Sequence, residues 1–248
     1  MFDLTGRVAI VTGANTGIGQ AIAIALAAAG ADIAAVGRTP AEDTAERIHA
    51  MGRKVGLIAA DLSRASPAGR IVAETVERLG GLDILVNNAG IIRRADAVDF
   101  TEADWDAVMD TNLKSAFFLS QAAARTMLPK GRGKIINIAS MLTFQGGIRV
   151  ASYTAAKSGI GGLTKLLANE WASSGINVNA IAPGYIATNN TRALRDDATR
   201  HQLILDRIPA HRWGEPEDLG GAAVFLASSA ADYVHGHILA VDGGWLAR

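Results

Sequence analysis

The sequence predicts a doubly wound α/β fold, in which helices cover both faces of a parallel sheet. Short aliphatic or β-branched runs recur along the chain, and a longer segment with helical spacing follows most of them. The runs are continuously apolar, as expected for strands buried on both faces. Strands that alternate with helices run parallel through right-handed crossovers.

The predicted strands consist mainly of Val, Ile, Leu and Ala, with Lys or Asn in the runs 134–138 and 176–181. The first run, Val8-Ala9-Ile10-Val11, is entirely aliphatic, which is typical of a strand at the centre of a sheet. In chain order the predicted strands are residues 8–11, 33–36, 55–59, 84–86, 134–138, 176–181 and 238–241.

The predicted helices lie between these strands, and the first of them is Ala-rich and has Gly30 placed to end it. They are residues 20–29, 41–51, 67–79, 102–112, 115–127, 153–171 and about 218–226. No Pro-rich, Ser-rich or charged linker divides the chain, so we expect a single domain over residues 1–248. The least regular stretch, about 185–213, is expected to project from the carboxyl ends of the strands as a substrate loop.

Composition excludes several classes of protein. Hydrophobic residues make up 49% and charged residues 19%, which supports a sizeable core and excludes global disorder. Twenty-four basic residues balance 24 acidic ones, so nucleic-acid binding has no bulk electrostatic support. With 0 Cys there is no disulfide, thiolate nucleophile or cysteine-bound zinc, and no His-Glu-x-x-His motif occurs, so we expect no metal. Residues 8–31 lack charge, but polar residues and glycines interrupt them, so we expect no membrane span. The N-terminus lacks secretory features, and we expect a cytoplasmic protein.

A glycine-rich turn follows the first strand and opens the Ala-rich helix. Its sequence is Thr12-Gly13-Ala14-Asn15-Thr16-Gly17-Ile18-Gly19. Glycines let the backbone approach a pyrophosphate, and the free N–H groups at a helix N-terminus attract the anion. The spacing Gly-x-x-x-Gly-x-Gly differs from the dinucleotide fingerprint, and tight packing alone is the competing explanation. No Gly-Lys-Ser or Gly-Lys-Thr follows, which disfavours a Walker phosphate loop.

The second strand ends at Gly37-Arg38, where a dinucleotide-binding fold contacts the adenosine ribose. An acid at this point binds the 2′-hydroxyl of NAD, whereas an Arg accommodates the 2′-phosphate of NADP. No acid occurs until Glu42, so Arg38 favours NADP, with a solvated turn residue as the alternative.

Two side chains on the predicted long helix form a candidate proton-transfer pair. Tyr153 and Lys157 are four residues apart and share a face. A cation lowers the pKa of a nearby phenol by favouring the phenolate. Ser140 ends the fifth predicted strand, where its hydroxyl could hydrogen-bond a substrate oxygen.

These motifs together resemble the short-chain dehydrogenase/reductase family over essentially the whole chain. The matching segments, all in the family's order, are the turn 12–19, Asp61-Leu62, Asn87-Asn88-Ala89-Gly90, Asn112, Ser140, Tyr153 with Lys157, and Pro183-Gly184. The resemblance implies a Rossmann-type fold, NAD(P), and oxidation of an alcohol or reduction of a ketone.

The resemblance also implies a role for each matching residue. Tyr153 would be the general acid/base, Ser140 the polarising hydroxyl, Lys157 the ribose ligand, and Asn112 the support of a water in a proton relay. The implied cofactor-binding residues are Gly13, Asn15, Thr16, Gly17, Ile18, Gly19, Arg38, Asp61, Leu62, Asn88, Ala89, Gly90, Tyr153, Lys157, Pro183, Gly184, Ile186 and Thr188.

Finer matching resembles a bacterial subgroup that acts on keto-deoxy sugar acids. It covers residues 87–94, 140–150, 182–191 and the ending 241–248. Such substrates carry a carboxylate and hydroxyls, so Arg94 and Arg149 are candidate carboxylate partners and Gln145 and Asn189 candidate hydroxyl partners, with surface roles equally open. The subgroup is usually described with NAD, whereas Arg38 favours NADP, and the preference stays open.

Three other functions compete with this interpretation. A 3-oxoacyl-carrier-protein reductase would share the same catalytic residues, with Arg93 and Arg94 facing an acidic carrier. A non-catalytic nucleotide sensor typically loses the Tyr or the Lys, and a serine hydrolase would need a Gly-x-Ser-x-Gly elbow that is absent. The family also implies a homotetramer, with the small-molecule substrate as its other partner.

Overall fold

The seven predicted strands form one parallel sheet in the computed structural model, which describes residues 1–63 and 67–248. The strands are β1 (Val8–Thr12), β2 (Asp32–Gly37), β3 (Val55–Ala59), β4 (Ile84–Asn87), β5 (Gly133–Ile138), β6 (Ile176–Pro183) and β7 (Ile238–Val241). Their order is β3-β2-β1-β4-β5-β6-β7, and every neighbouring pair is parallel. The order reverses between β1 and β4, and this switch point opens a crevice at the carboxyl ends of the strands. The prediction of a Rossmann-type doubly wound sheet is confirmed.

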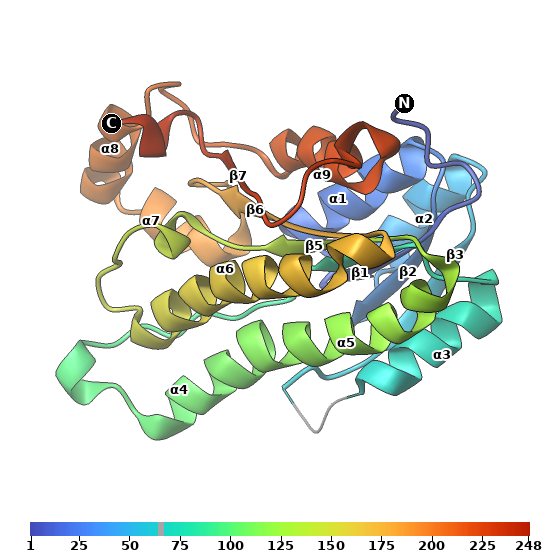
Figure 1. Cartoon of the computed structure of the whole chain (residues 1–248). Helices are drawn as coiled ribbons and strands as arrows, with labels where there is room; N and C mark the ends of the chain where they lie inside the picture. The colour runs from blue at the N-terminus through green and yellow to red at the C-terminus, as the bar shows by residue number, and fades with distance from the viewer. Residues whose placement is uncertain (64–66) are drawn as a thin grey trace.

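Helices cover both faces of the sheet, as Figure 1 shows. One layer contains α1 (Gly17–Ala28), α2 (Glu42–Ala50) and α9 (Gly220–Ala227). The other contains α3 (Ala68–Leu79), α5 (Ser115–Met127) and α6 (Ala151–Trp171), with α4 (Glu102–Met109) against α6. Successive strand residues face opposite layers, so Ala9 and Val11 pack with α1 and α9 while Ile10 packs with α3 and α5. In the described part of the chain, no helix has the length and apolarity that a membrane crossing requires.

Two segments differ from the predictions. The α-helix predicted over 102–112 ends at Met109, and a π-helical segment, Asp110–Lys114, joins α4 to α5. The stretch 185–213, predicted as irregular, contains α7 (Arg192–Arg195) and α8 (Ala198–Arg207), which lie at one end of the molecule beside the C-terminus (Figure 1). Asp197 caps α8 by accepting hydrogen bonds from two backbone amides, and the buried Ile204 anchors it.

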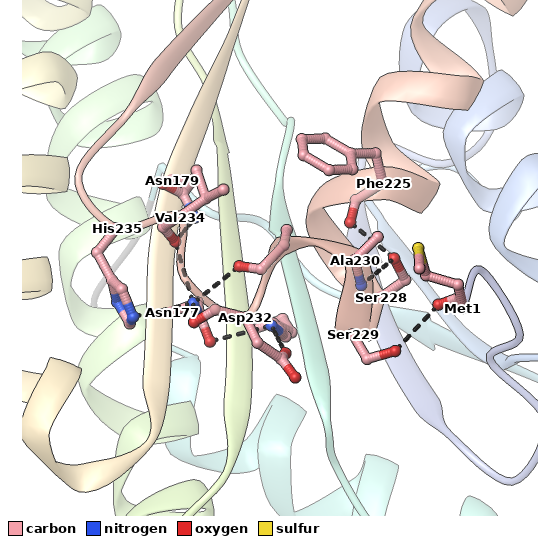
Figure 2. Close-up of polar contacts among 12 residues, drawn as sticks. Met1, Asn177, Asn179, Phe225, Ser228, Ser229, Ala230, Asp232, Val234 and His235 are labelled. Atoms are coloured by element: carbon pink, nitrogen blue, oxygen red, sulfur yellow. Dashed lines mark hydrogen bonds and ion pairs between the residues drawn. The ribbon is translucent and has the colours of Figure 1, made fainter.

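Two buried asparagines of β6 anchor the segment that leads into β7 (Figure 2). The Asn177 side-chain amide lies 3.0 Å from the carbonyl oxygens of both Asp232 and Val234. Asn179 donates to Val234 at 2.8 Å and accepts from the His237 amide at 2.9 Å. These bonds satisfy the buried polar side chains of β6, which explains why a strand paired on both sides tolerates them.

Candidate active site

The glycine-rich turn is held against the end of β4 by a buried hydroxyl. Thr12 Oγ1 accepts from the backbone amides of Asn88 and Ala89, each at 2.9 Å. The Asn88 side chain donates back to the Thr12 carbonyl at 2.8 Å. A Cβ on Gly19 would come within 3.0 Å of the Gly13 carbonyl and of the Asn88 amide, so no side chain fits there. Backbone packing therefore fixes the turn that opens α1.

Two glycines of the turn adopt left-handed backbone conformations. The φ angles are +66° at Gly13 and +57° at Gly17. The resulting turn leaves the N-terminus of α1, a helix of 12 residues, facing the crevice. The Thr16 side chain makes no cap bond there, so the first N–H groups of the helix remain open to an anion.

The crevice holds two adjoining cavities. The larger is about 670 Å³ and the smaller about 330 Å³, and both are lined by Gly13, Asn15, Ala89 and Gly90. The larger extends over the glycine-rich turn to the 183–191 segment, and the smaller lies between the ends of β2 and β3. Their combined size and elongated lining suit a dinucleotide with its adenosine in the smaller cavity.

All the predicted cofactor-binding residues line these cavities. Arg38, Asp61 and Leu62 line the smaller one. The others line the larger one, namely Gly13, Asn15, Thr16, Gly17, Ile18, Gly19, Asn88, Ala89, Gly90, Tyr153, Lys157, Pro183, Gly184, Ile186 and Thr188. Parallel strands end at the same edge of a sheet, so motifs far apart in sequence meet here.

Tyr153 and Lys157 lie together on the wall of the larger cavity. Lys157 Nζ is 5.6 Å from the centroid of the Tyr153 ring and donates to the Ile138 carbonyl at 2.5 Å. Burial lowers the pKa of Lys157 from 10.5 to about 8. Burial raises the pKa of the Tyr153 phenol, while a hydrogen bond with Ser140 and the positive charge of Arg94 act in the opposite direction. The phenol is therefore protonated at neutral pH in the free protein.

Asn112 occupies the π-helical segment and bonds to the backbone of the 88–91 loop. Its Oδ1 accepts from the Ile91 amide and its Nδ2 donates to the Ile91 carbonyl, both at 2.8 Å. The side chain is 2% exposed and lines neither cavity. Such π-helical turns often occur at functional sites, and this one places the Asn112 side chain against the 88–91 loop.

The four candidate substrate residues have different partners, and one of the four lines the larger cavity. Arg94 is exposed and donates to the Asn190 carbonyl at 3.1 Å, which ties two loops together over the cleft. Gln145 accepts from the Trp245 indole at 3.3 Å. Arg149 pairs with Asp96 at 3.1 Å and does not line the cleft. Asn189 does line it.

The sequence analysis missed several residues that line the larger cavity. Among them are the guanidinium of Arg195 and the carboxylates of Glu215 and Glu217. Their only signal was a position inside or just after the polar stretch 185–213, which contains many charged residues. In the described ranges, no three His, Asp or Glu side chains gather as a metal site would require.

A dinucleotide-sized cleft at the switch point, with a Tyr–Lys pair on its wall and a Ser hydroxyl hydrogen-bonded to the Tyr, defines a nicotinamide-nucleotide-dependent oxidoreductase. A model of the family described as enoyl-(acyl carrier protein) reductase matches residues 13–246. A 2-dehydro-3-deoxy-D-gluconate 5-dehydrogenase of Dickeya dadantii is 59% identical over 248 residues, covering 100% of this chain and 98% of that one. The chain therefore belongs to the short-chain dehydrogenase/reductase family, and it is an NAD(P)-dependent dehydrogenase.

Two solved structures extend the comparison. A protein of Agrobacterium tumefaciens, solved with bound NADP, is 62% identical with a TM-score of 0.95, covering 100% of this chain and 99% of that one. A gluconate 5-dehydrogenase of Burkholderia cenocepacia, solved with NADP and tartrate, is 42% identical with a TM-score of 0.94, covering 100% and 98%.

Proposed function

We propose that this enzyme interconverts a secondary alcohol and a ketone on a keto-deoxy sugar acid of the 2-dehydro-3-deoxy-D-gluconate or 2-deoxy-D-gluconate type. The observation that carries the reaction type is the Tyr153 phenol on the cleft wall, hydrogen-bonded to Ser140 and 5.6 Å from the Lys157 ammonium. The full-length match at 59% identity to a 2-dehydro-3-deoxy-D-gluconate 5-dehydrogenase supports the substrate class.

The chain's own residues transfer the proton and stabilise the phenolate that takes part in the transfer. When bound, the nicotinamide accepts or donates the hydride. Tyr153 takes the alcohol proton during oxidation and returns it during reduction, and Ser140 holds the same substrate oxygen through its hydroxyl. The Lys157 cation stabilises the Tyr153 phenolate by charge attraction. Asn112 keeps the Ile91 backbone in place and supports the relay that carries the proton to solvent.

The residues around the smaller cavity favour NADP. Arg38 follows β2, is exposed, and lines the cavity where the adenosine ribose would lie. A guanidinium there gives a 2′-phosphate two donors and a positive charge. The Agrobacterium and Burkholderia relatives were both solved with NADP. We expect Arg38→Ala to weaken NADPH by about 10-fold or more and to leave NADH within about 2-fold.

Arg94 and Asn189 are the strongest candidates for holding the sugar acid. Arg94 is near enough to Tyr153 to lower the pKa of the phenol, so a carboxylate paired with Arg94 would lie near the reacting oxygen. Asn189 lines the same cavity and offers amide groups to hydroxyls. Arg149 pairs with Asp96 and Gln145 with Trp245, so in our proposal they shape the loops around the substrate.

A turnover panel tests the proposal. Keto-deoxy sugar acids and an acetoacetyl thioester are offered with NADH and NADPH in parallel. We expect a kcat/KM for a sugar acid at least 100-fold above that for the thioester. Preferred turnover of the thioester would support a 3-oxoacyl-carrier-protein reductase instead. Cofactor binding without turnover of any substrate would support a nucleotide sensor.

We also propose a cytoplasmic homotetramer. Trp105 on α4, Phe118 on α5 and Leu166 on α6 are 40%, 36% and 46% exposed, and β7 is an edge strand that another copy could cover. Light scattering should give four times the 25.8 kDa chain mass, and a mass near 25.8 kDa would contradict the tetramer.

A further inference from the structure

Arg195, in the 185–213 segment, lines the larger cavity. It is the last residue of α7, and its Nη2 donates to the Thr188 carbonyl at 3.1 Å. It lines the cavity together with Thr16, Gly17 and Ile18 of the phosphate-binding turn. The turn at 188–191 approaches the glycine-rich turn closely, because a Cβ on Gly17 would lie 3.4 Å from Thr188 Cγ2. Arg195 and the N-terminus of α1 therefore border the same cavity.

The Arg195 guanidinium has bonding capacity to spare. Its Nε is buried and has no hydrogen-bond partner among the residues that the structure describes. The ion pairs found within 1–63 and 67–248 do not include Arg195, whereas Arg192 on the same helix pairs with Asp196. The terminal guanidinium nitrogens, of which Nη2 already donates to the Thr188 carbonyl, are the donors that can reach an anion in the cavity.

The charged side chains that line the cavity indicate which ligand group the Arg195 guanidinium would bind. Within the described ranges, Lys157 and Arg195 are the two Lys or Arg side chains that line it, and Lys157 is already bonded to the Ile138 carbonyl. Glu215 and Glu217 line the same cavity and would repel a bound anion. A pyrophosphate placed on the α1 N-terminus would gain from a further cation, and Arg195 is positioned to supply one.

We propose that Arg195 binds the cofactor's pyrophosphate from the side of the 185–213 segment, opposite the glycine-rich turn. Because Arg195 also holds the Thr188 carbonyl, the same contact fixes the 188–191 turn over the cofactor. The inference rests on cofactor binding in the larger cavity, as in the proposed function. A substrate carboxylate is the other anion that could reach this cavity, and the experiment separates the two.

The test compares ligands that differ in which parts of the cofactor they carry. Dissociation constants are measured by calorimetry for NADPH, for 2′-phospho-ADP-ribose, which has the pyrophosphate but no nicotinamide, and for 2′,5′-ADP, which has neither. The variants are Arg195→Gln and the matched control Arg192→Gln, one turn earlier on the same helix. Circular dichroism and melting temperature confirm that both variants fold.

We expect Arg195→Gln to weaken NADPH and 2′-phospho-ADP-ribose by about 10- to 100-fold each and to leave 2′,5′-ADP within about 2-fold, as for a lost charge-assisted hydrogen bond. Arg192→Gln should leave all three unchanged. NADPH should also slow thermolysin cleavage within 185–213 in the wild type more than in Arg195→Gln at equal saturation.

Three results would overturn the inference. Unchanged binding of 2′-phospho-ADP-ribose with a raised KM for the sugar acid would assign Arg195 to the substrate carboxylate. Weakened NADPH with unchanged 2′-phospho-ADP-ribose would show that Arg195 acts only by holding the Thr188 turn near the nicotinamide. A wild type that fails to bind NADPH would overturn the proposed cofactor site as well, whereas the first two results leave that site intact.

Discussion

Replacing Lys157 by Met should make the cofactor-free protein more stable at neutral pH. The Lys157 ammonium is buried, and it serves cofactor binding and proton transfer in the proposed function rather than folding. Met keeps an unbranched apolar chain of similar length and removes the charge. Burying an ammonium costs free energy because water solvates the charged form better than protein does.

The cost follows from the pKa of Lys157. Burial lowers it from 10.5 to about 8, and each unit corresponds to about 1.4 kcal/mol, so the charge costs about 3 kcal/mol at pH 7. Losing the hydrogen bond to the Ile138 carbonyl and the contact with the Tyr153 ring offsets about 1–2 kcal/mol of that. The variant should therefore gain about 1–2 kcal/mol in the free energy of unfolding at pH 7.

The pH dependence gives a sharper test than the absolute gain. Below pH 8 the lysine is protonated in both the folded and unfolded states, so the full cost is present. Between about pH 8 and 10.5 the folded state has lost this proton and the unfolded state has kept it, so wild-type stability rises with pH. From pH 7 to 9.5 wild type should gain about 2 kcal/mol relative to Lys157→Met. Urea denaturation of both proteins at several pH values measures this change. A difference that stays constant across this range would refute the burial argument.

Three further substitutions test the packing around the cleft. Gly19→Ala should weaken NADPH binding at least 10-fold and lower the melting temperature, because its Cβ would overlap the glycine-rich turn. The control Gly221→Ala on α9 has open space around it and should leave stability unchanged or raise it. Equal effects of the two substitutions would contradict the steric argument. Asn112→Ala should cost about 1–3 kcal/mol in urea denaturation, because it removes both hydrogen bonds from the part-buried Ile91 backbone groups. A cost below about 0.5 kcal/mol would show that water replaces them. Thr12→Val keeps the shape of the side chain but leaves the backbone amides of Asn88 and Ala89 without their acceptor. We expect it to lower the free energy of unfolding by about 2–3 kcal/mol in the same assay, and an unchanged stability would contradict this.

Most of the fold was predictable because its signals are local. Most strands are short apolar runs, and the structure moves strand ends by at most two residues from the prediction, as at β6, which extends to Pro183. The predicted cofactor residues gather in one crevice because parallel strands share a carboxyl edge. The positions of the motifs on the predicted sheet therefore indicated many of the residues that line the cleft.

The features that sequence analysis missed depend on tertiary contacts. The predicted helices end at 112 and begin again at 115, but no local residue pattern shows that a π-helical segment, Asp110–Lys114, joins them. Arg149 offers the same charge as any other candidate carboxylate partner, and only the folded chain brings Asp96 to it. Arg195 is one of several arginines in a polar stretch, and its buried Nε becomes visible only in three dimensions.

The most direct test of the proposed chemistry is Tyr153→Phe, which removes one hydroxyl from the cleft wall. NADPH dissociation constants and kcat are measured for the variant and wild type with the best sugar acid from the panel. If Tyr153 transfers the proton, kcat falls by about 10²- to 10⁴-fold while the NADPH dissociation constant stays within about 3-fold. A kcat within 10-fold of wild type would contradict the assignment of Tyr153 as the general acid/base.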